Sequence, residues 1–117
     1  MSRHSAGGLD VSRTAPMFAA LGDETRLALV ARLSSDGPLS ITRLTAGTAV
    51  TRQAVTKHLS VLATAGLVSG LRRGRERIWE LEPEQMEAAS TYLEQVSKRW
   101  DDALVRLKQF VEEGEKQ

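Results

Sequence analysis

Cysteine is absent from this 117-residue chain, and aromatic residues make up only 4% of it. Without cysteine the chain has no disulfide, no thiolate metal ligand and no cysteine nucleophile. No apolar run approaches the roughly 18–20 residues that a membrane-spanning helix needs. Residues 1–16 lack the apolar segment of a secretory signal. We therefore expect a cytoplasmic protein that does not enter a membrane.

The chain is also short and carries little net charge. A chain of 117 residues has the size of a single domain, which excludes large multidomain enzymes and barrels. A hydrophobic fraction of 41% with a net charge of +1 excludes a fully disordered chain. We expect one domain over residues 14–113, between a flexible tail at residues 1–13 and a C-terminal tail at residues 114–117.

The small net charge hides an uneven distribution along the sequence. Residues 51–77 contain six basic residues and one acidic residue, whereas residues 78–117 contain five basic and ten acidic residues. A compact basic stretch beside an acidic one is typical of a polyanion contact, although a solvated charged face is the alternative. The basic residues of the stretch are Arg52, Lys57, Arg72, Arg73, Arg75 and Arg77.

Capping residues and apolar periodicity predict two helices in the first third of the chain. Thr14 can cap the first helix, with Pro16 in its first turn. Asp23 can cap the second, which ends before Asp36 and the Gly-Pro pair that follows it. Apolar residues on two stripes predict that the second helix is well buried: Leu27, Leu29, Val30, Ala31 and Leu33.

Two further helices and a short turn follow. A third helix begins at Ser40, and Thr51 caps a fourth that ends at Gly66. The end of the third helix is not defined, because Gly47 falls inside its pattern. The fourth helix has one apolar face formed by Val55, Leu59 and Leu62. Its opposite face carries Arg52, Gln53, Thr56, Lys57 and Ser60.

The next segment predicts a β-hairpin. Residues 67–72 and 76–81 alternate as strands do, and Arg73, Gly74 and Arg75 form the tight turn between them. The hairpin, at about residues 67–82, places four arginines near its turn. The fold class is therefore mainly α with a small β-hairpin.

The last predicted helix, at about residues 84–113, is too long for so small a domain to cover. At 1.5 Å per residue it would be about 45 Å long. Its apolar residues alternate at intervals of three and four, a heptad-like seam that predicts a dimerisation helix. The alternative is that one end of the seam packs on its own core. The expected dimer interface comprises Met17, Phe18, Met86, Leu93, Val96, Trp100, Ala103, Leu107 and Phe110, with Ala89 also in the seam.

The third and fourth helices have the pattern of a helix-turn-helix, and the hairpin adds the wing of a winged helix. The second helix of this motif lies in the DNA major groove, where Gln53 could read adenine and Arg52 could read guanine. Thr51, Thr56 and Lys57 suit phosphate oxygens, and wing arginines can touch the backbone or enter the minor groove. The expected DNA-binding residues are Ser40, Thr51, Arg52, Gln53, Thr56, Lys57, Arg72, Arg73, Arg75 and Arg77.

Three segments resemble the ArsR-type winged helix-turn-helix repressors over about residues 15–83: ALGDETRLALVARL, LSITRLTAGTAVTRQAVTKHLSVLATAGLV and RRGRERIWEL. The C-terminal helix resembles the dimerisation element of that family. The resemblance implies a homodimeric transcriptional repressor that binds near-palindromic operators in double-stranded DNA, often at its own promoter. It also implies that an inducer releases the protein from DNA.

Metal-sensing members of that family use cysteines in the first helix of the motif, or histidine and acidic residues in the last helix. Here the corresponding stretch, LSITRL, has no thiol, and the last helix has no histidine. The two histidines are His4, in the tail, and His58, and one imidazole without neighbours does not make a metal site. We therefore expect the metal-independent, cysteine-less branch, with no cofactor and with a structural role for His58.

The sequence leaves open whether an effector binds. Phe18, Tyr92 and Trp100 could line a cavity between two protomers and hold an apolar small molecule. The alternative is that these aromatic residues belong to the core. An enzyme is not expected, because two separated histidines and solvated carboxylates provide no catalytic pair. RNA is not expected either, because the narrow A-form major groove does not admit the helix. A protein-interaction adaptor that uses the winged helix and C-terminal helix is the alternative function, but it would not need six basic residues.

Overall fold

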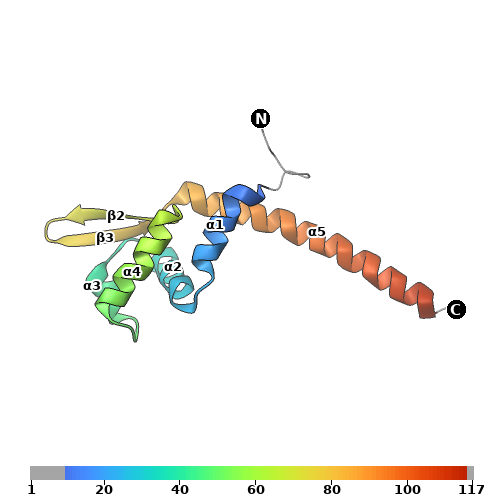
Figure 1. Cartoon of the computed structure of the whole chain (residues 1–117), viewed down its shortest axis with the longest axis horizontal. Coiled ribbons are helices and arrows are strands. Elements are labelled where there is room, and N and C mark those ends of the chain that lie inside the picture. Colours follow the sequence, from blue (N-terminus) through green and yellow to red (C-terminus); the bar gives the residue numbers. More distant parts are fainter. Residues whose placement is uncertain (1–9, 116–117) are drawn as a thin grey trace.

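The computed structural model describes residues 10–115 as a small helical body from which one long helix projects (Figure 1). A three-stranded antiparallel sheet completes the body, which confirms the expected class of mainly α with a small β-hairpin. The elements in chain order are α1 (Val11–Leu21), α2 (Glu24–Asp36), β1 (Leu39–Ser40), α3 (Ile41–Ala46), α4 (Arg52–Thr64), β2 (Val68–Arg73), β3 (Glu76–Leu81) and α5 (Pro83–Glu115).

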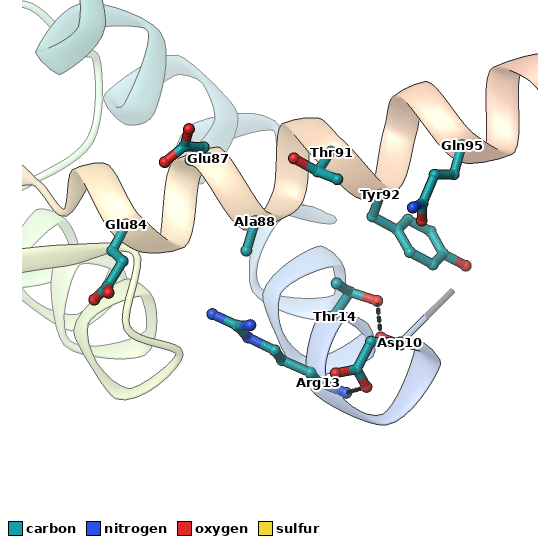
Figure 2. Close-up of a pocket in the computed structure, with 9 residues that line it drawn as sticks. All are labelled: Asp10, Arg13, Thr14, Glu84, Glu87, Ala88, Thr91, Tyr92 and Gln95. Atoms are coloured by element: carbon teal, nitrogen blue, oxygen red, sulfur yellow. Dashed lines mark hydrogen bonds between the residues drawn. The ribbon is translucent and has the colours of Figure 1, made fainter. Parts of the chain in front are cut away.

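Helix α1 begins one turn earlier than the sequence predicts. The Asp10 side chain accepts a hydrogen bond from the backbone N–H of Arg13 (3.1 Å) and is the N-cap, whereas Thr14 lies inside the helix and donates to the Asp10 carbonyl (2.7 Å; Figure 2). Asp and Thr are both good caps, and the earlier one adds a turn in which Thr14 is buried. Residues 11–13 are therefore helical and not part of a tail, and Pro16 is inside the helix. Residues 1–9, including His4, lie outside the described residues.

Helix α2 buries one face and not two. Asp23 caps it as predicted, accepting from the backbone N–H of Arg26 (3.0 Å). Leu29, Val30 and Leu33 are buried, but Leu27 is 53% exposed and Ala31 is also exposed. The prediction of a well-buried helix is therefore confirmed for the stripe of Leu29 and Leu33 and wrong for Leu27 and Ala31, which face away from the core.

The helix-turn-helix pair has the predicted caps. The Ser40 hydroxyl accepts from the backbone N–H of Arg43 (3.2 Å), and the Thr51 hydroxyl accepts from that of Ala54 (3.1 Å). Helix α3 ends at Ala46, so Gly47 follows the helix. Gly66, with φ of 81°, turns the chain after α4.

The sheet contains one strand that the sequence analysis missed. The predicted hairpin is present, and Gly74, with φ of 60°, occupies its turn. Strand β1 pairs with the other edge of β3, with Leu39 opposite Trp79 and Ser40 opposite Ile78. A strand of two residues has no alternation from which it could be predicted, so only the pairing partner reveals it.

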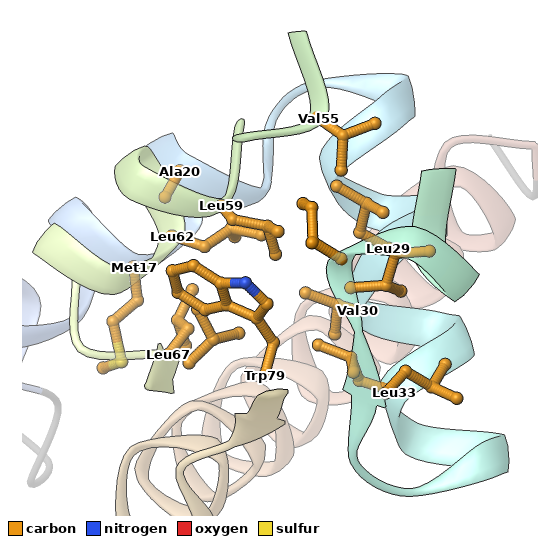
Figure 3. Packing of buried hydrophobic residues seen from close by; sticks show 14 of the residues in the cluster. Met17, Ala20, Leu29, Val30, Leu33, Val55, Leu59, Leu62, Leu67 and Trp79 are labelled. Carbon is orange, nitrogen blue, oxygen red and sulfur yellow. The ribbon is translucent and has the colours of Figure 1, made fainter. Parts of the chain in front are cut away.

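The core lies between the helices and the sheet, and Trp79 points into it among Leu59, Leu62 and Leu67 (Figure 3). Val55, Leu59 and Leu62 are fully buried, which confirms the predicted inner face of α4. Met17 is only 1% exposed and belongs to this core. Its assignment to a dimer interface was wrong, because α1 turns this side chain towards its own domain.

Helix α5 has two different halves. Near its start, Ala89 is buried and Met86 packs against the core, so the first part of the seam covers the protein's own domain. From residue 97 to residue 115 every residue is exposed, and this half projects away from the body (Figure 1). The helix includes residues 114 and 115, which were expected in a tail, and the last two residues lie outside the described part. Within residues 10–115, no helix is long and apolar enough to cross a membrane.

Candidate nucleic-acid interface

The first half of α4 presents a polar surface. Thr51, at the N-cap, and Arg52, Gln53, Thr56 and Lys57 are all exposed, whereas Val55, Leu59 and Leu62 are buried in the core. Five of the predicted DNA-binding residues are thus brought together at the N-terminal end of one helix. The partial positive charge of a helix N-terminus adds to the attraction that Arg52 and Lys57 exert on an anion.

The hydrogen bonds that these side chains make determine which of their donor and acceptor atoms remain free for DNA. Thr51 accepts from Ala54, so its hydroxyl proton remains available for a phosphate oxygen. Thr56 instead donates its proton to the carbonyl of Arg52 (2.9 Å), so only its lone pairs are available until that bond breaks. Arg52 donates to the hydroxyl of Thr42 on α3 (3.4 Å), which links the two helices at their exposed surface.

Around helix α3 the structure differs in two ways from the predicted set of DNA-binding residues. Ser40 is only 9% exposed and its hydroxyl caps α3, so the structure does not bring it to the surface with the other predicted residues. Thr42 is exposed beside Arg52, its neighbour Arg43 is also exposed, and the sequence analysis included neither. Their position between the buried Ile41 and Leu44 was the available signal, because the polar residues between inward-facing positions face solvent.

The wing carries the other four predicted residues, and all are exposed: Arg72, Arg73, Arg75 and Arg77. The register places Arg72 directly opposite Arg77. Two like charges opposite one another destabilise a hairpin unless an anion lies near them. The hairpin projects from the body at the end opposite the free end of α5 (Figure 1).

Arg77 differs from its neighbours because the sheet holds it in place. Its guanidinium lies over the Trp79 ring, 5.0 Å from the ring centroid, in a cation–π contact. A Cβ at Gly70, on the neighbouring strand, would lie 2.7 Å from Arg77 Nε and 3.1 Å from the Trp79 ring. Gly70 therefore leaves room for this contact, and Arg77 is more restrained than the arginines near the turn.

His58 lies on the α2 side of α4, away from the polar face. Its Nδ1 is 3.2 Å from a guanidinium nitrogen of Arg26 and 3.8 Å from a carboxylate oxygen of Asp23. The hydrogen bond from the backbone N–H of Arg26 holds the pKa of Asp23 below its ordinary value. His58 thus connects α4 with the N-terminus of α2. Among the described residues, no group of three or more histidine, aspartate and glutamate side chains could hold a metal ion.

A cleft of about 410 Å³ lies between α1 and α5 (Figure 2). Most of the residues that line it are polar or charged, Arg13 and Glu87 among them. Of the three aromatic residues expected around an effector, Tyr92 lines this cleft, and the Phe18 ring lies 5.6 Å from its ring. Trp100 is 68% exposed two turns further along α5, so one copy of the chain does not bring the three together.

The free half of α5 exposes most of the remaining apolar seam. Val96 is half-buried, and Leu93, Trp100, Ala103, Leu107 and Phe110 are exposed. Leu104 and Val111, which the sequence analysis did not include, widen the same face of the helix.

A family model described as a helix-turn-helix domain matches residues 21–70, which include α2, α3 and α4. The chain is 39% identical over 93 residues to the HTH-type transcriptional regulator Rv2034 of Mycobacterium tuberculosis, covering 80% of this chain and 83% of the relative. It is also similar to the solved structure of an ArsR-like transcriptional regulator from Rhodococcus sp. RHA1. That similarity has 33% identity, coverage of 85% of this chain and 92% of the other, and a TM-score of 0.67.

A third similarity concerns the fold alone. The solution structure of a homodimeric winged helix-turn-helix DNA-binding domain from Mycobacterium bovis, a possible ArsR-family regulator, is 22% identical. The similarity covers 86% of this chain and 94% of that domain, with a TM-score of 0.61. The relatives from Mycobacterium tuberculosis and Rhodococcus are both described as transcriptional regulators, and we expected a protein of this kind and not an enzyme. The chain belongs to the ArsR-type family of winged helix-turn-helix transcriptional regulators and contains the DNA-binding helix-turn-helix domain of that family.

Proposed function

We propose that the protein is a homodimeric repressor that binds a near-palindromic operator in double-stranded DNA. The observation that carries this proposal is the common exposure of all six basic residues of 51–77 on α4 and on the wing. In such an arrangement Gln53 and Arg52 contact base edges in the major groove, and Thr51 and Lys57 contact phosphates. The wing arginines contact the flanking backbone or minor groove.

Dimerisation through α5 supports the same function. A monomer would leave Trp100, Leu107 and Phe110 in water, and a second copy of the helix can cover them. The domain from Mycobacterium bovis with the same fold is described as homodimeric. Twofold symmetry would direct two α4 helices into successive major-groove faces about 34–36 Å apart.

We further propose that this repressor acts without a metal and in the cytoplasm, including at its own promoter. The chain has no cysteine and α5 has no histidine, so the thiolate and imidazole ligands of the metal-sensing members of the family are both missing. Repression then follows from occupancy of a promoter site, which blocks access of other proteins to the same DNA. The proposal includes no effector: Phe18 and Tyr92 pair with each other within one chain, and a cavity that also includes the exposed Trp100 would need a second protomer.

Selection of bound fragments from random duplex DNA tests the proposal. We expect two inverted half-sites whose centres are about 10–10.5 base pairs apart. If about 6–10 phosphates are neutralised, affinity for the selected fragment falls roughly 10³–10⁵-fold between 50 and 200 mM salt. Recovery of no consensus, or an affinity that does not change with salt, would contradict DNA recognition by this surface.

A further inference from the structure

Arg32, on α2, reaches across to the C-terminal end of α3. One of its guanidinium nitrogens donates a hydrogen bond to the backbone carbonyl of Arg43 (3.2 Å). Its Nε lies 3.6 Å from a carboxylate oxygen of Asp36, one turn further along α2. The Arg32 side chain is 30% exposed. Arg32 therefore connects the supporting helix α2 to the first helix of the helix-turn-helix.

The carbonyl of Arg43 is available because α3 ends with a tighter turn. In a continuing α-helix the N–H of Gly47 would donate to the Arg43 carbonyl, but it donates to Leu44 instead (3.3 Å). The last carbonyls of a helix need partners from outside it. A guanidinium is well suited to this position, because the C-terminal end of a helix carries partial negative charge.

Gly47 provides the space that this guanidinium occupies. A Cβ built on Gly47 would overlap Nη1 of Arg32 and lie 2.9 Å from its Cζ. The φ angle of Gly47 is −92°, which any residue can adopt, so the backbone itself does not require glycine. Gly47 is also the first residue of the turn between α3 and α4. The next residues of the turn are held by the Thr48 hydroxyl, which accepts from the N–H of Val50 (2.9 Å).

We infer that Arg32 is a positioning residue for sequence-specific DNA binding, and that it can reach the end of α3 because Gly47 leaves room for its guanidinium. It holds the end of α3 and the turn after it, and this turn sets the direction in which α4 meets the major groove. This inference rests on the proposed function. Hydrogen bonds to base edges depend on the position of α4 more strongly than contacts between cations and phosphates do. Loss of the contact should therefore weaken specific binding and leave nonspecific binding nearly unchanged.

The experiment compares Gly47→Ala, Arg32→Gln and the double variant on two duplexes. One duplex is the fragment selected by the parent protein from random DNA, and the other has the same bases in scrambled order. Gly47→Ala keeps every charge and displaces the guanidinium. Gly22→Ala is the matched control, because Gly22 also follows a helix at negative φ and its added Cβ would meet only carbonyl oxygens at 3.5 Å.

We expect Gly47→Ala and Arg32→Gln each to weaken binding of the selected duplex about fivefold to tenfold, which is the effect of one lost hydrogen bond. Gly47→Ala should change binding of the scrambled duplex less than twofold. The double variant should be little weaker than either single variant, because both remove the same contact. Gly22→Ala should bind both duplexes as the parent does.

Other outcomes would overturn the inference. If Arg32→Gln weakens both duplexes equally and Gly47→Ala weakens neither, Arg32 is a phosphate contact. If Gly47→Ala alone has an effect, the alanine disturbs the turn without involving Arg32. A third outcome is that binding of both duplexes falls equally, and stoichiometric titration shows that the fall comes from a smaller fraction of active protein. In that case the contact only stabilises the fold. A parent protein that selects no sequence would instead contradict the proposed function.

Discussion

Replacing Trp100 by alanine tests whether the free half of α5 is the dimer interface. Trp100 is 68% exposed in a single chain, and aromatic side chains of this kind bury up to about 250 Å². Full burial against a second copy would therefore remove about 170 Å² from water for each chain. At about 25 cal/mol per Å², and allowing for the Cβ that alanine retains, the loss is about 3 kcal/mol per chain.

The effect on the dimer is twice the effect on one chain, because a twofold interface contains each residue twice. A loss of about 6 kcal/mol would raise the dissociation constant of the dimer by about four orders of magnitude. We expect sedimentation equilibrium to show a monomer at concentrations where the parent protein is a dimer. The monomer should also bind its operator much more weakly, because the second half-site contact is no longer intramolecular.

The other tryptophan and a nearby valine provide the controls. Trp79 is 5% exposed in the core, so Trp79→Ala should unfold the domain, whereas Trp100→Ala should keep the helical circular dichroism of a folded domain. Val105 is 56% exposed but lies on the side of α5 away from the seam, so Val105→Ala should remain dimeric. A Trp100→Ala protein that is dimeric at the same concentration as the parent would place the interface elsewhere.

Three further expectations concern recognition, metal and pH. Gln53→Ala should relax the preference at one position of each half-site by about 1–3 kcal/mol, whereas Arg75→Ala should weaken all duplexes alike and reduce the salt slope. Repeated selection with each variant checks this, and identical sequence profiles for both would contradict the separate roles. Zinc should leave operator affinity and thermal stability unchanged, since the chain has no cysteine, and a stoichiometric submicromolar zinc site seen by calorimetry would oppose this. The folded-state pKa of Asp23 is below its ordinary value of 3.8, so its ionised form stabilises the fold above that pH and the contribution is lost as pH falls through the folded pKa. Asp23→Asn keeps a capping side chain but cannot ionise. The difference in melting temperature between the parent and this variant should therefore narrow as the pH falls below about 4. A difference that stays constant down to pH 2 would contradict this role of the Asp23 charge.

The order of helix, turn, helix and wing could be predicted from residues close to one another in the chain. Thr51 caps α4 through a hydrogen bond to a residue three positions later, and Gly74 allows the tight turn of the hairpin. The inner face of α4 follows from the spacing of Val55, Leu59 and Leu62. Such interactions act over one or two turns, so the local sequence contains all the information they need.

The tertiary structure alone decided which apolar side chains belong to the core and which remain for a partner. Met17 and Trp100 both lie on apolar helix faces, yet the first is 1% exposed and the second 68% exposed. The same holds for β1, which exists only through its pairing with β3, and for Arg32, whose partner carbonyl belongs to another helix. Periodicity identifies an apolar face of a helix, but its burial depends on the elements that pack against it, and the chain brings these together only when it folds.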